Sequence, residues 1–414
     1  MAKVLNKRGT RSEINSAATA NELNAGEVYL ITDENRIAMG TSANTYESYA
    51  KESEAGGGGG GTSPTVALSI TAADLSVNAV YTRILPKDYE INGTVIAALS
   101  TDKWTNNIGH SDGTITSLSF NDLIGISGSL QPNSMNALTT LLFPELKFVE
   151  LNIQPSSMAV LISLSFPKLV AIGNTFQPSS MASLTSILLP SLSVIGLNFV
   201  LSGFFALTTL AVPNLITIAG AFNLTSVSIL TTLNFPSLIT IGQNFNIGSM
   251  SSLTTLTFPS LTVVGNSFTI APSSTITTFS FPSLTKICGI FSISSMASLT
   301  SASFPAIERI ATTVTSGNAI VINSNTGSLV TFTLPTTLKQ VGKSGGAIVI
   351  TSAALNQSSV DNILVRLAAL DGTNNTVLFS NRAVTITGTS STPSATGLTA
   401  KSTLVSRGCT VTHN

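Results

Sequence analysis

A proline recurs every 23 residues through the middle of this 414-residue chain, and this period constrains the fold more than any other feature. The eight prolines in register are Pro144, Pro167, Pro190, Pro213, Pro236, Pro259, Pro282 and Pro305. A fixed period of this length indicates a solenoid, in which each coil stacks on the one before and shares a continuous core with it. A degenerate coil begins near Ile115. A later coil reaches Pro335 after 30 residues, which predicts a seven-residue insertion between Ala311 and Ser328.

Apolar residues hold fixed positions relative to each proline. Position −6 is leucine or isoleucine, position +5 is valine or isoleucine, and position +9 is phenylalanine in six consecutive coils before Val314 takes it. The six phenylalanines are Phe176, Phe199, Phe222, Phe245, Phe268 and Phe291. Their fixed register with the leucines predicts an interior ladder, in preference to an exposed stacking platform for sugars or bases.

Each coil is expected to add one short strand to a parallel ladder, because the Leu-x-x-Leu-x-Phe stretch before the proline ends in the alternation typical of strands. Neighbouring strands would lie about 4.8 Å apart, and the remainder of each coil would be irregular or extended. Glycine at position +6 would permit a sharp bend. It occurs at Gly173, Gly196, Gly242 and Gly265.

Composition divides the chain into five parts, which are residues 1–55, 56–61, 62–114, 115–350 and 351–414. The first part holds 14 of the 38 charged side chains and is expected to anchor and oligomerise, with one weak helix over 12–24. Six glycines then form a hinge, because glycine loses the most entropy on ordering. A β-rich cap, the solenoid and a C-terminal cap follow.

The predicted fold class is therefore mainly β. We expect a leucine-rich-repeat solenoid of 23-residue coils with short parallel strands, a small N-terminal anchoring module and a small α/β C-terminal cap. In that cap, Ser358 is expected to be the N-cap of a helix that runs to about Leu370, and the final strands are expected to cover the open end of the solenoid.

Three segments carry a resemblance to known families. The stretch from Leu253 to Phe268 resembles the leucine-rich repeats of BspA-like bacterial surface antigens, and the likeness extends over about residues 115–345. The segment from residue 355 to the end is similar to the closing unit of repeat-bearing tailed-phage fibre proteins, although Cys409 stands where tryptophan often follows the Arg-Gly pair. The pattern over residues 26–40, a β-hairpin signal, is similar to the particle-attachment hairpins of phage fibres.

The resemblance implies a virion appendage whose N-terminal part binds other virion proteins and forms a homotrimer. The candidate anchor residues are Tyr29, Ile31, Arg36, Ile37 and Met39. We expect a phage structural protein, a tail or head fibre that is assembled in the host cytoplasm and presents the repeat surface to a host glycan or protein. The alternatives are a capsid decoration or head fibre that needs no receptor, and a bacterial BspA-like surface adhesin.

Paired threonines at positions −5 and −4 form the candidate binding face. The pairs are Thr139-Thr140, Thr208-Thr209, Thr231-Thr232 and Thr254-Thr255. On a parallel ladder they would align into rows of hydroxyl donors and acceptors, which suit docking through many neutral hydrogen bonds. The alternative is that threonine is simply a good exposed strand residue and that the rows bind nothing.

Charge and motif content argue against other classes of function. Charged residues are 9% of the chain and balance at 19 basic and 19 acidic side chains, so we expect no nucleic-acid binding. Polar residues interrupt every apolar run, and the first residues lack a signal-peptide core, so we expect neither membrane insertion nor a secretory signal. Cys288 and Cys409 are predicted to be buried, inert thiols.

Catalysis is also not expected. Glu145 and Glu150 could form a glycosidase pair, but a glycosidase needs two facing carboxylates, and no second acidic row runs across the coils. His110 and His413 lack neighbours at metal-ligand spacing. The glycine run lacks the Lys-Ser/Thr ending of a phosphate-binding loop. We therefore predict no enzyme activity, depolymerase activity included, no cofactor and no metal.

Overall fold

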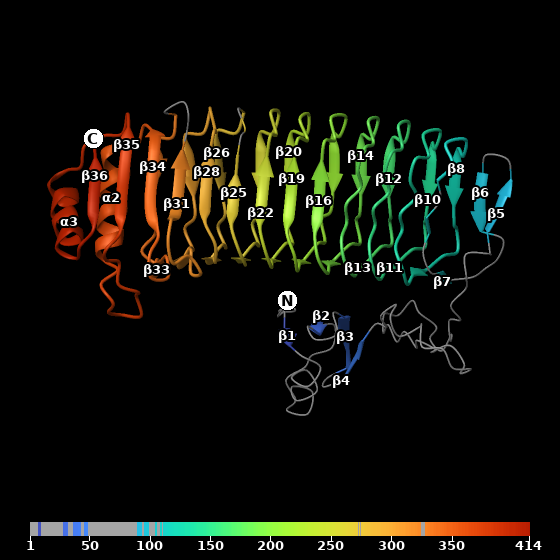
Figure 1. The fold of residues 1–414 in the computed structure, drawn as a ribbon, viewed down its shortest axis with the longest axis horizontal. Coiled ribbons are helices and arrows are strands. Elements are labelled where there is room, and N and C mark those ends of the chain that lie inside the picture. The colour runs from blue at the N-terminus through green and yellow to red at the C-terminus, as the bar shows by residue number, and fades with distance from the viewer. Residues whose placement is uncertain are drawn as a thin grey trace. The chain divides into compact units, whose positions relative to one another are not determined.

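The computed structural model describes residues 108–414 except residues 110, 272, 274 and 324–327, and before residue 108 it describes the backbone of seven short strands. The fold is mainly β: a parallel-strand β-solenoid of about 13 coils with a spacing of ~23 residues, as the proline period predicts (Figure 1). The chain divides into two compact units. The first is Met1–Leu161, Ser165–Pro178 and Val194–Leu197, and the second is Ile162–Leu164, Ser179–Ser193 and Asn198–Asn414.

A four-stranded sheet lies near the N-terminus, and it contains the predicted hairpin. Strands β2 (Val28–Ile31) and β3 (Arg36–Ser42) pair in antiparallel fashion, with Val28 opposite Met39. Strand β1 (Lys7–Gly9) pairs in parallel with β2, and β4 (Thr45–Ser48) pairs in antiparallel fashion with β3. The hairpin is therefore confirmed, whereas the predicted helix over 12–24 and the glycine hinge over 56–61 lie outside the described residues.

The coils of the first unit begin at a second hairpin, formed by β5 (Tyr89–Asn92) and β6 (Val95–Ala98). Parallel strands β8 (Ser117–Ser119) and β10 (Thr140–Leu142) continue from β6. A second ladder of two-residue strands runs beside them in consecutive order. Its strands are β7 (Trp104–Thr105), β9 (Gly125–Ile126), β11 (Phe148–Val149), β13 (Ala171–Ile172) and β15 (Val194–Ile195).

Each regular coil of the second unit contributes one strand to each of three parallel ladders, and the first ladder is interrupted. The first ladder holds the strands just before the prolines. One of its sheets consists of β12 (Ser163–Ser165), β14 (Ser186–Leu188) and β17 (Thr209–Ala211), and a separate sheet consists of β20 (Thr232–Asn234), β23 (Thr255–Thr257), β26 (Thr278–Ser280), β29 (Ser301–Ser303) and β32 (Thr331–Phe332). The second holds β18 (Thr217–Ile218), β21 (Thr240–Ile241), β24 (Val263–Val264), β27 (Lys286–Ile287), β30 (Arg309–Ile310) and β33 (Gln340–Val341).

The third ladder is a nine-stranded sheet that ends in the C-terminal cap. It holds β16 (Phe199–Ser202), β19 (Phe222–Thr225), β22 (Phe245–Gly248), β25 (Phe268–Ile270), β28 (Phe291–Ser294), β31 (Asn318–Asn323), β34 (Ala347–Ala353), β35 (Ala383–Gly388) and β36 (Thr410–His413). The expectation of one strand per coil is therefore wrong. The residues after each proline also alternate between buried and half-buried positions, as Phe222 to Thr225 do, and they pair with the next coil.

Two columns of phenylalanine rings fill the core of the second unit. Phe245 and Phe268, at position +9, stack with ring centroids 4.6 Å apart and planes 5° from parallel. Phe258 and Phe281, at position −1, form a second stack at 5.6 Å. Rings of the two columns meet edge to face, as Phe245 and Phe258 do at 81°. The predicted interior ladder is confirmed, because all six +9 phenylalanines are at most 1% exposed.

Glycine at position +6 has a different role from the predicted sharp bend. Neither Gly173 nor Gly265 has a positive φ. A Cβ on Gly265 would instead lie 2.0 Å from the carbonyl oxygen of Gly242 in the preceding coil, so glycine is required for the close approach of successive coils. The sharp bend occurs at position +13, where serines adopt left-handed backbone conformations. They are Ser134, Ser157, Ser180, Ser226, Ser249 and Ser295.

The insertion lies where the 30-residue interval predicts it, before and after β31. This strand places Ile320 opposite Phe291, so Ile320 occupies the +9 column and the assignment of Val314 to that column is wrong. The C-terminal part contains helix α2 (Gln357–Ala368), which Asn356 caps instead of Ser358, and helix α3 (Ala395–Ser406), which was not predicted. In the described part of the chain, no helix is long and apolar enough to cross a bilayer.

Candidate ligand-binding face

The predicted threonine pairs lie at the ladder of strands that precede the prolines, and all eight side chains are exposed. Each −4 threonine begins a strand, as Thr209 does in β17 and Thr232 in β20. The −5 threonine stands just before it. We call these exposed −5 and −4 residues the threonine face. In the second unit the register Thr232↔Thr255 aligns successive −4 residues, so their spacing is that of neighbouring strands, about 4.8 Å.

The hydroxyls at position −5 take part in the fold. Thr208 Oγ1 donates a hydrogen bond to the carbonyl oxygen of Thr185 at 3.2 Å, and Thr254 Oγ1 donates to that of Thr231 at 3.1 Å. In the first unit, Thr139 Oγ1 donates in the same way to the carbonyl of residue 116. These bonds cross from one coil to the preceding one. The hydroxyls of Thr139, Thr208 and Thr254 therefore stabilise the stacking of coils and offer a ligand only their acceptor lone pairs, whereas Thr231 makes no such bond among the described residues.

The hydroxyls at position −4 differ in this respect. Within the described residues, the Oγ1 atoms of Thr140, Thr209, Thr232 and Thr255 have no hydrogen-bond partner, and each side chain is exposed. Hydroxyls also stand two residues further on in later coils, at Thr257 in β23 and Ser280 in β26. The −4 hydroxyls can therefore both donate and accept hydrogen bonds to a ligand, and those of Thr232 and Thr255 repeat at the strand spacing because their strands are paired.

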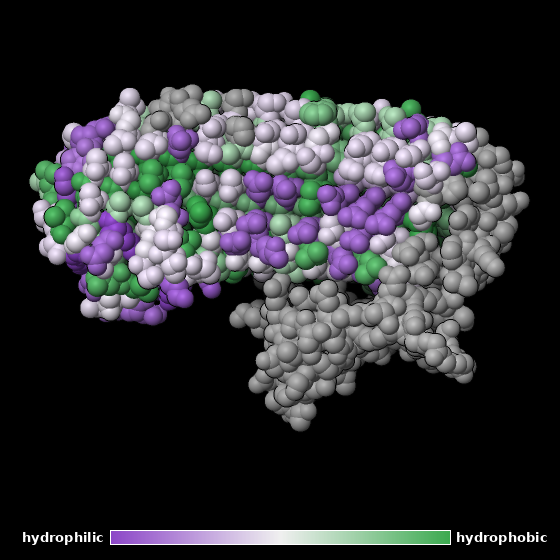
Figure 2. Space-filling view, in the orientation of Figure 1, coloured by the Kyte–Doolittle hydropathy of each residue, from purple (hydrophilic) through white to green (hydrophobic). Residues whose placement is uncertain are grey.

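Ionisable side chains are absent from a long stretch of these coils. Between Lys168 and Lys286 the sequence contains not one Asp, Glu, Lys, Arg or His. In the space-filling view, hydrophilic and near-neutral residues cover much of the visible side of the described coils, with scattered apolar ones (Figure 2). The threonine face of the second unit therefore lacks the charge needed for long-range attraction of ions.

The groups considered for catalysis do not converge. Glu145 forms an exposed ion pair with Lys168, with its Oε1 atom 2.7 Å from Nζ. No group of three or more His, Cys, Asp or Glu suited to a metal ion occurs among the residues that the structure places. His413 Nε2 lies 3.1 Å from the Nζ of Lys401, and His110 lies outside the described residues.

Shifted pKa values occur in the C-terminal part of the chain, away from the threonine pairs in sequence. Burial lowers the pKa of the Arg382 guanidinium, which stacks 4.8 Å from the ring centroid of Phe379. Hydrogen bonds from Thr373 lower the pKa of the Asp371 carboxyl. Cys409 is a buried free thiol, as predicted, whereas Cys288 is only half-buried.

The candidate anchor residues belong to the N-terminal hairpin. The pairs Tyr29↔Ala38 and Ile31↔Arg36 alternate along the strands with the pairs that contain Ile37 and Met39. The five residues therefore fall in two alternating sets of paired positions, with Tyr29, Ile31 and Arg36 in one set and Ile37 and Met39 in the other.

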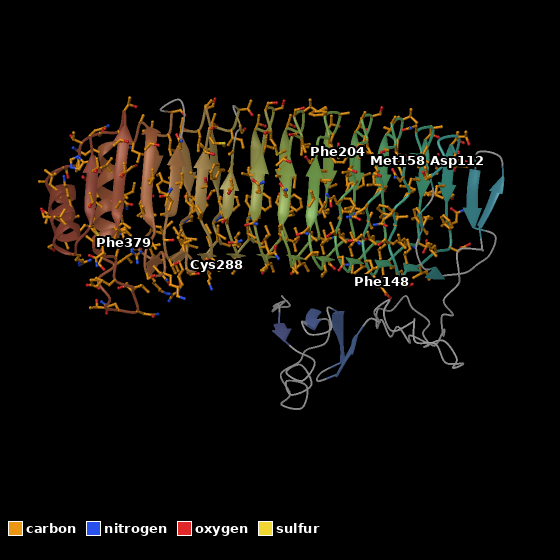
Figure 3. The ribbon with its side chains drawn as sticks, viewed as in Figure 1. Asp112, Phe148, Met158, Phe204, Cys288 and Phe379 are labelled. Carbon is orange, nitrogen blue, oxygen red and sulfur yellow. The ribbon has the colours of Figure 1, made fainter. Side chains whose placement is uncertain are left out.

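Phe205 is a surface residue that the sequence analysis missed. It is 65% exposed, whereas the other 18 of the 19 phenylalanines are buried. The adjacent Phe204, at position +14 just after β16, is fully buried in the interior of the coil (labelled in Figure 3). The equivalent positions of neighbouring coils hold Ala182 and Ser228, so comparison along the 23-residue period would have revealed the exception. No protein-family model, curated protein sequence or solved structure matches this chain.

Proposed function

We propose that the chain is a structural protein of a tailed-phage particle, a tail or head fibre whose solenoid presents the threonine face to a host surface. The observation that carries the proposal is the set of exposed, unpartnered −4 hydroxyls in three successive coils, at Thr209 and at the paired Thr232 and Thr255, in a part of the solenoid without ionisable side chains. A repeating array of neutral donors and acceptors fits a repeating neutral ligand such as a surface glycan. Many weak contacts in series give avidity without any strong individual contact.

The remaining parts of the proposal come from the resemblance to phage fibres. The small sheet of β1–β4 would attach the fibre to other virion proteins, with Tyr29, Ile31, Arg36, Ile37 and Met39 as candidate contacts. The chain would be a homotrimer in the virion. The trimer would then carry three copies of the threonine face. Once one copy is bound, the other two are held at a high effective concentration near further receptors on the same surface.

A direct test is competition for adsorption. The purified full-length chain is added to susceptible bacteria before the phage, and the fraction of phage that adsorbs is measured. The proposal predicts that adsorption falls as the chain occupies the receptors. A variant with Thr209, Thr232 and Thr255 changed to valine should compete poorly, because valine keeps the branched shape and removes the hydroxyls. Competition by both proteins to the same extent would contradict a role for the threonine face.

One observation favours a second candidate, a head fibre or capsid decoration that needs no receptor. The −5 hydroxyls of Thr208 and Thr254 are engaged in hydrogen bonds to the preceding coil, so part of the threonine pattern serves the fold. This candidate predicts that particles lacking the chain adsorb and infect normally. Loss of adsorption on deletion would exclude it, and adsorption to host cells by a cell-surface form of the chain would instead favour a bacterial adhesin.

A further inference from the structure

The exposure of Phe205 has no explanation in the packing of its own coil. The interior column at this level is already filled by Phe204, and the equivalent surface positions hold the small residues Ala182, Ser228 and Ala297. An alanine there is compatible with the coil, so a large aromatic ring is not needed for folding. A phenylalanine with two thirds of its surface in water leaves most of its apolar area available for burial against a ligand.

The ring stands beside the threonine face. Thr208 follows Phe205 by three residues, which limits the separation of their Cα atoms to roughly 11 Å. The next coil places Ser228 and Ile229 at the positions that correspond to Phe205 and Ala206, and Ile229 is 41% exposed. An apolar corner of the coil therefore borders two threonine pairs, one in each of two successive coils of the second unit.

The hydroxyls beside this corner are of two kinds. Thr209 and Thr232 have hydroxyls without a partner among the described residues, and they hold the same position in two successive coils, although their strands β17 and β20 belong to separate sheets. Thr208 uses its hydroxyl hydrogen for the carbonyl of Thr185 but keeps acceptor capacity. The corner thus combines an aromatic ring, an aliphatic side chain and neutral groups that donate and accept hydrogen bonds.

Charge selects among possible ligands. The site lies well inside the stretch between Lys168 and Lys286, which has no ionisable side chain. A phosphate, a carboxylate or a cationic peptide would lose its hydration there without gaining an opposite charge. A neutral ligand with one apolar face and a rim of hydroxyls matches the surface, and a pyranose ring has this character: axial C–H groups on a face and hydroxyls at the edge.

We propose that Phe205, flanked by Ile229 and by the hydroxyls of Thr209 and Thr232, forms a binding subsite for a pyranose unit of a neutral polysaccharide. The sugar's C–H face stacks on the Phe205 ring, and its hydroxyls exchange hydrogen bonds with the two threonines. This inference rests on the proposed function, since it names the ligand class of the threonine face and places its strongest contact at one coil.

The test uses the full-length chain and affinity electrophoresis through gels that contain dextran, yeast mannan, galactomannan or hydroxyethylcellulose. At least one of these neutral polysaccharides should retard the chain, and high salt should leave the retardation unchanged because no charge is involved. Phe205→Ala should weaken binding about tenfold or more, in line with the loss of a buried aromatic contact. Phe205→Trp should retain binding, and Thr209→Val should weaken it by a smaller factor.

Val330→Ala provides the matched control. Val330 is 40% exposed and occupies a −5 position in a later coil, away from the apolar corner, so its removal should not change binding. Equal thermal midpoints for the wild type, Phe205→Ala and Val330→Ala would establish that the variants are folded.

Three results would overturn the inference. The first is binding by Phe205→Ala as tight as that of the wild type, and the second is the absence of retardation by every polysaccharide of the set. The third is loss of self-association in Phe205→Ala, measured by sedimentation velocity, which would assign the ring to contact with a second copy. If the chain nevertheless competes for phage adsorption, only the subsite is wrong. If it neither binds polysaccharide nor competes, the proposed function fails as well.

Discussion

The regular coils and the C-terminal part of the same chain achieve a folded state by different means. Residues 169–285 contain no charged side chain, whereas residues 306–414 contain ten. The ten are Glu308, Arg309, Lys339, Lys343, Asp361, Arg366, Asp371, Arg382, Lys401 and Arg407. The difference indicates that charge is dispensable where each coil repeats the previous one and becomes useful where the repetition ends.

In the regular coils, repetition itself satisfies the polar groups. Asn198 Oδ1 accepts a hydrogen bond from the backbone N–H of Ala221 at 2.8 Å, and Asn244 Oδ1 accepts one from that of Ser267 at 3.2 Å. Each contact joins residues that are 23 positions apart, one in each of two successive coils. A neutral amide therefore suffices to pair a backbone group that would otherwise be left without a partner.

In the C-terminal part, single charged residues hold particular segments together. The carboxylate of Asp361 in α2 accepts hydrogen bonds from the Ser394 backbone N–H at 2.9 Å and from its hydroxyl at 2.5 Å, at the start of α3. Arg407 Nη1 donates to the carbonyls of Ala368 and Leu370 at 2.8 and 3.2 Å. Hydrogen bonds to charged groups are stronger than neutral ones, so one side chain can fix a connection that no neighbouring coil repeats.

The largest difference in stability is expected between a buried and an exposed phenylalanine of the coils. Phe245→Ala should lower the free energy of unfolding by about 3–5 kcal/mol, because it opens a cavity between stacked rings. Phe205→Ala should change it by less than about 0.5 kcal/mol. Chemical denaturation followed by circular dichroism measures both. Similar losses in the two variants would contradict the description of the core.

Two glycines should sharpen the contrast between close packing and backbone conformation. Gly265→Ala places a Cβ 2.0 Å from the Gly242 carbonyl oxygen, and separating the coils should cost about 3 kcal/mol. A Cβ at Gly203 would have no atom within 4 Å, and only the positive φ of 76° disfavours alanine there. Gly203→Ala should therefore lower the free energy of unfolding by about 1 kcal/mol. The same denaturation experiment checks the order, and the reverse order would show that coil contact does not explain Gly265.

Loss of a charge in the C-terminal part should have a local effect. Asp361→Ala removes both acceptors at the start of α3 and should cost about 2 kcal/mol. Hydrogen exchange should accelerate in residues 394–406 while β16 to β28 stay protected. Lys343→Ala, at an exposed residue, serves as the control and should leave exchange unchanged. Acceleration throughout the solenoid would mean that the two regions do not differ as proposed.

The smallest expected effect is a gain in stability. Ser249 has a φ of 54°, which glycine adopts without the steric cost that a Cβ imposes, so Ser249→Gly should stabilise the chain by about 1 kcal/mol. Ser183→Gly is the matched control, because Ser183 is exposed and lacks a positive φ. This substitution should lower the free energy of unfolding by about 0.5 kcal/mol. A loss at both positions would show that the +13 serines are not strained.

The sequence was sufficient for features that repeat. The proline period predicted the coils, and the +9 phenylalanines predicted an interior column, because a core position must recur at the same point of every coil. The strand before each proline was also predicted, but the other two ladders were missed because strands of two to four residues leave too short an alternation to detect. The close approach at Gly265 depends on a backbone atom one coil away, which no local pattern records.

The parts outside the repeat were harder to predict. Helix α3 is rich in Ser and Thr, which lowers its helix propensity, and its buried face consists of Gly397, Ala400 and Leu404. The candidate site was predicted as rows of threonine. The difference between the bonded −5 hydroxyls and the unpartnered −4 hydroxyls required the hydrogen-bond geometry of the coils. Phe205 could have been found from the sequence, because the neighbouring coils hold Ala182 and Ser228 at its position.

Immunogold electron microscopy of purified phage particles tests the central proposal most directly. Antibody raised against residues 115–345 should label the particles, because the proposed fibre projects its solenoid from the virion. Label at the tail tip fits receptor binding, and label over the capsid fits a head fibre or decoration. Tailed particles from a lysate that contains the chain, all without label, would contradict a virion role for this protein.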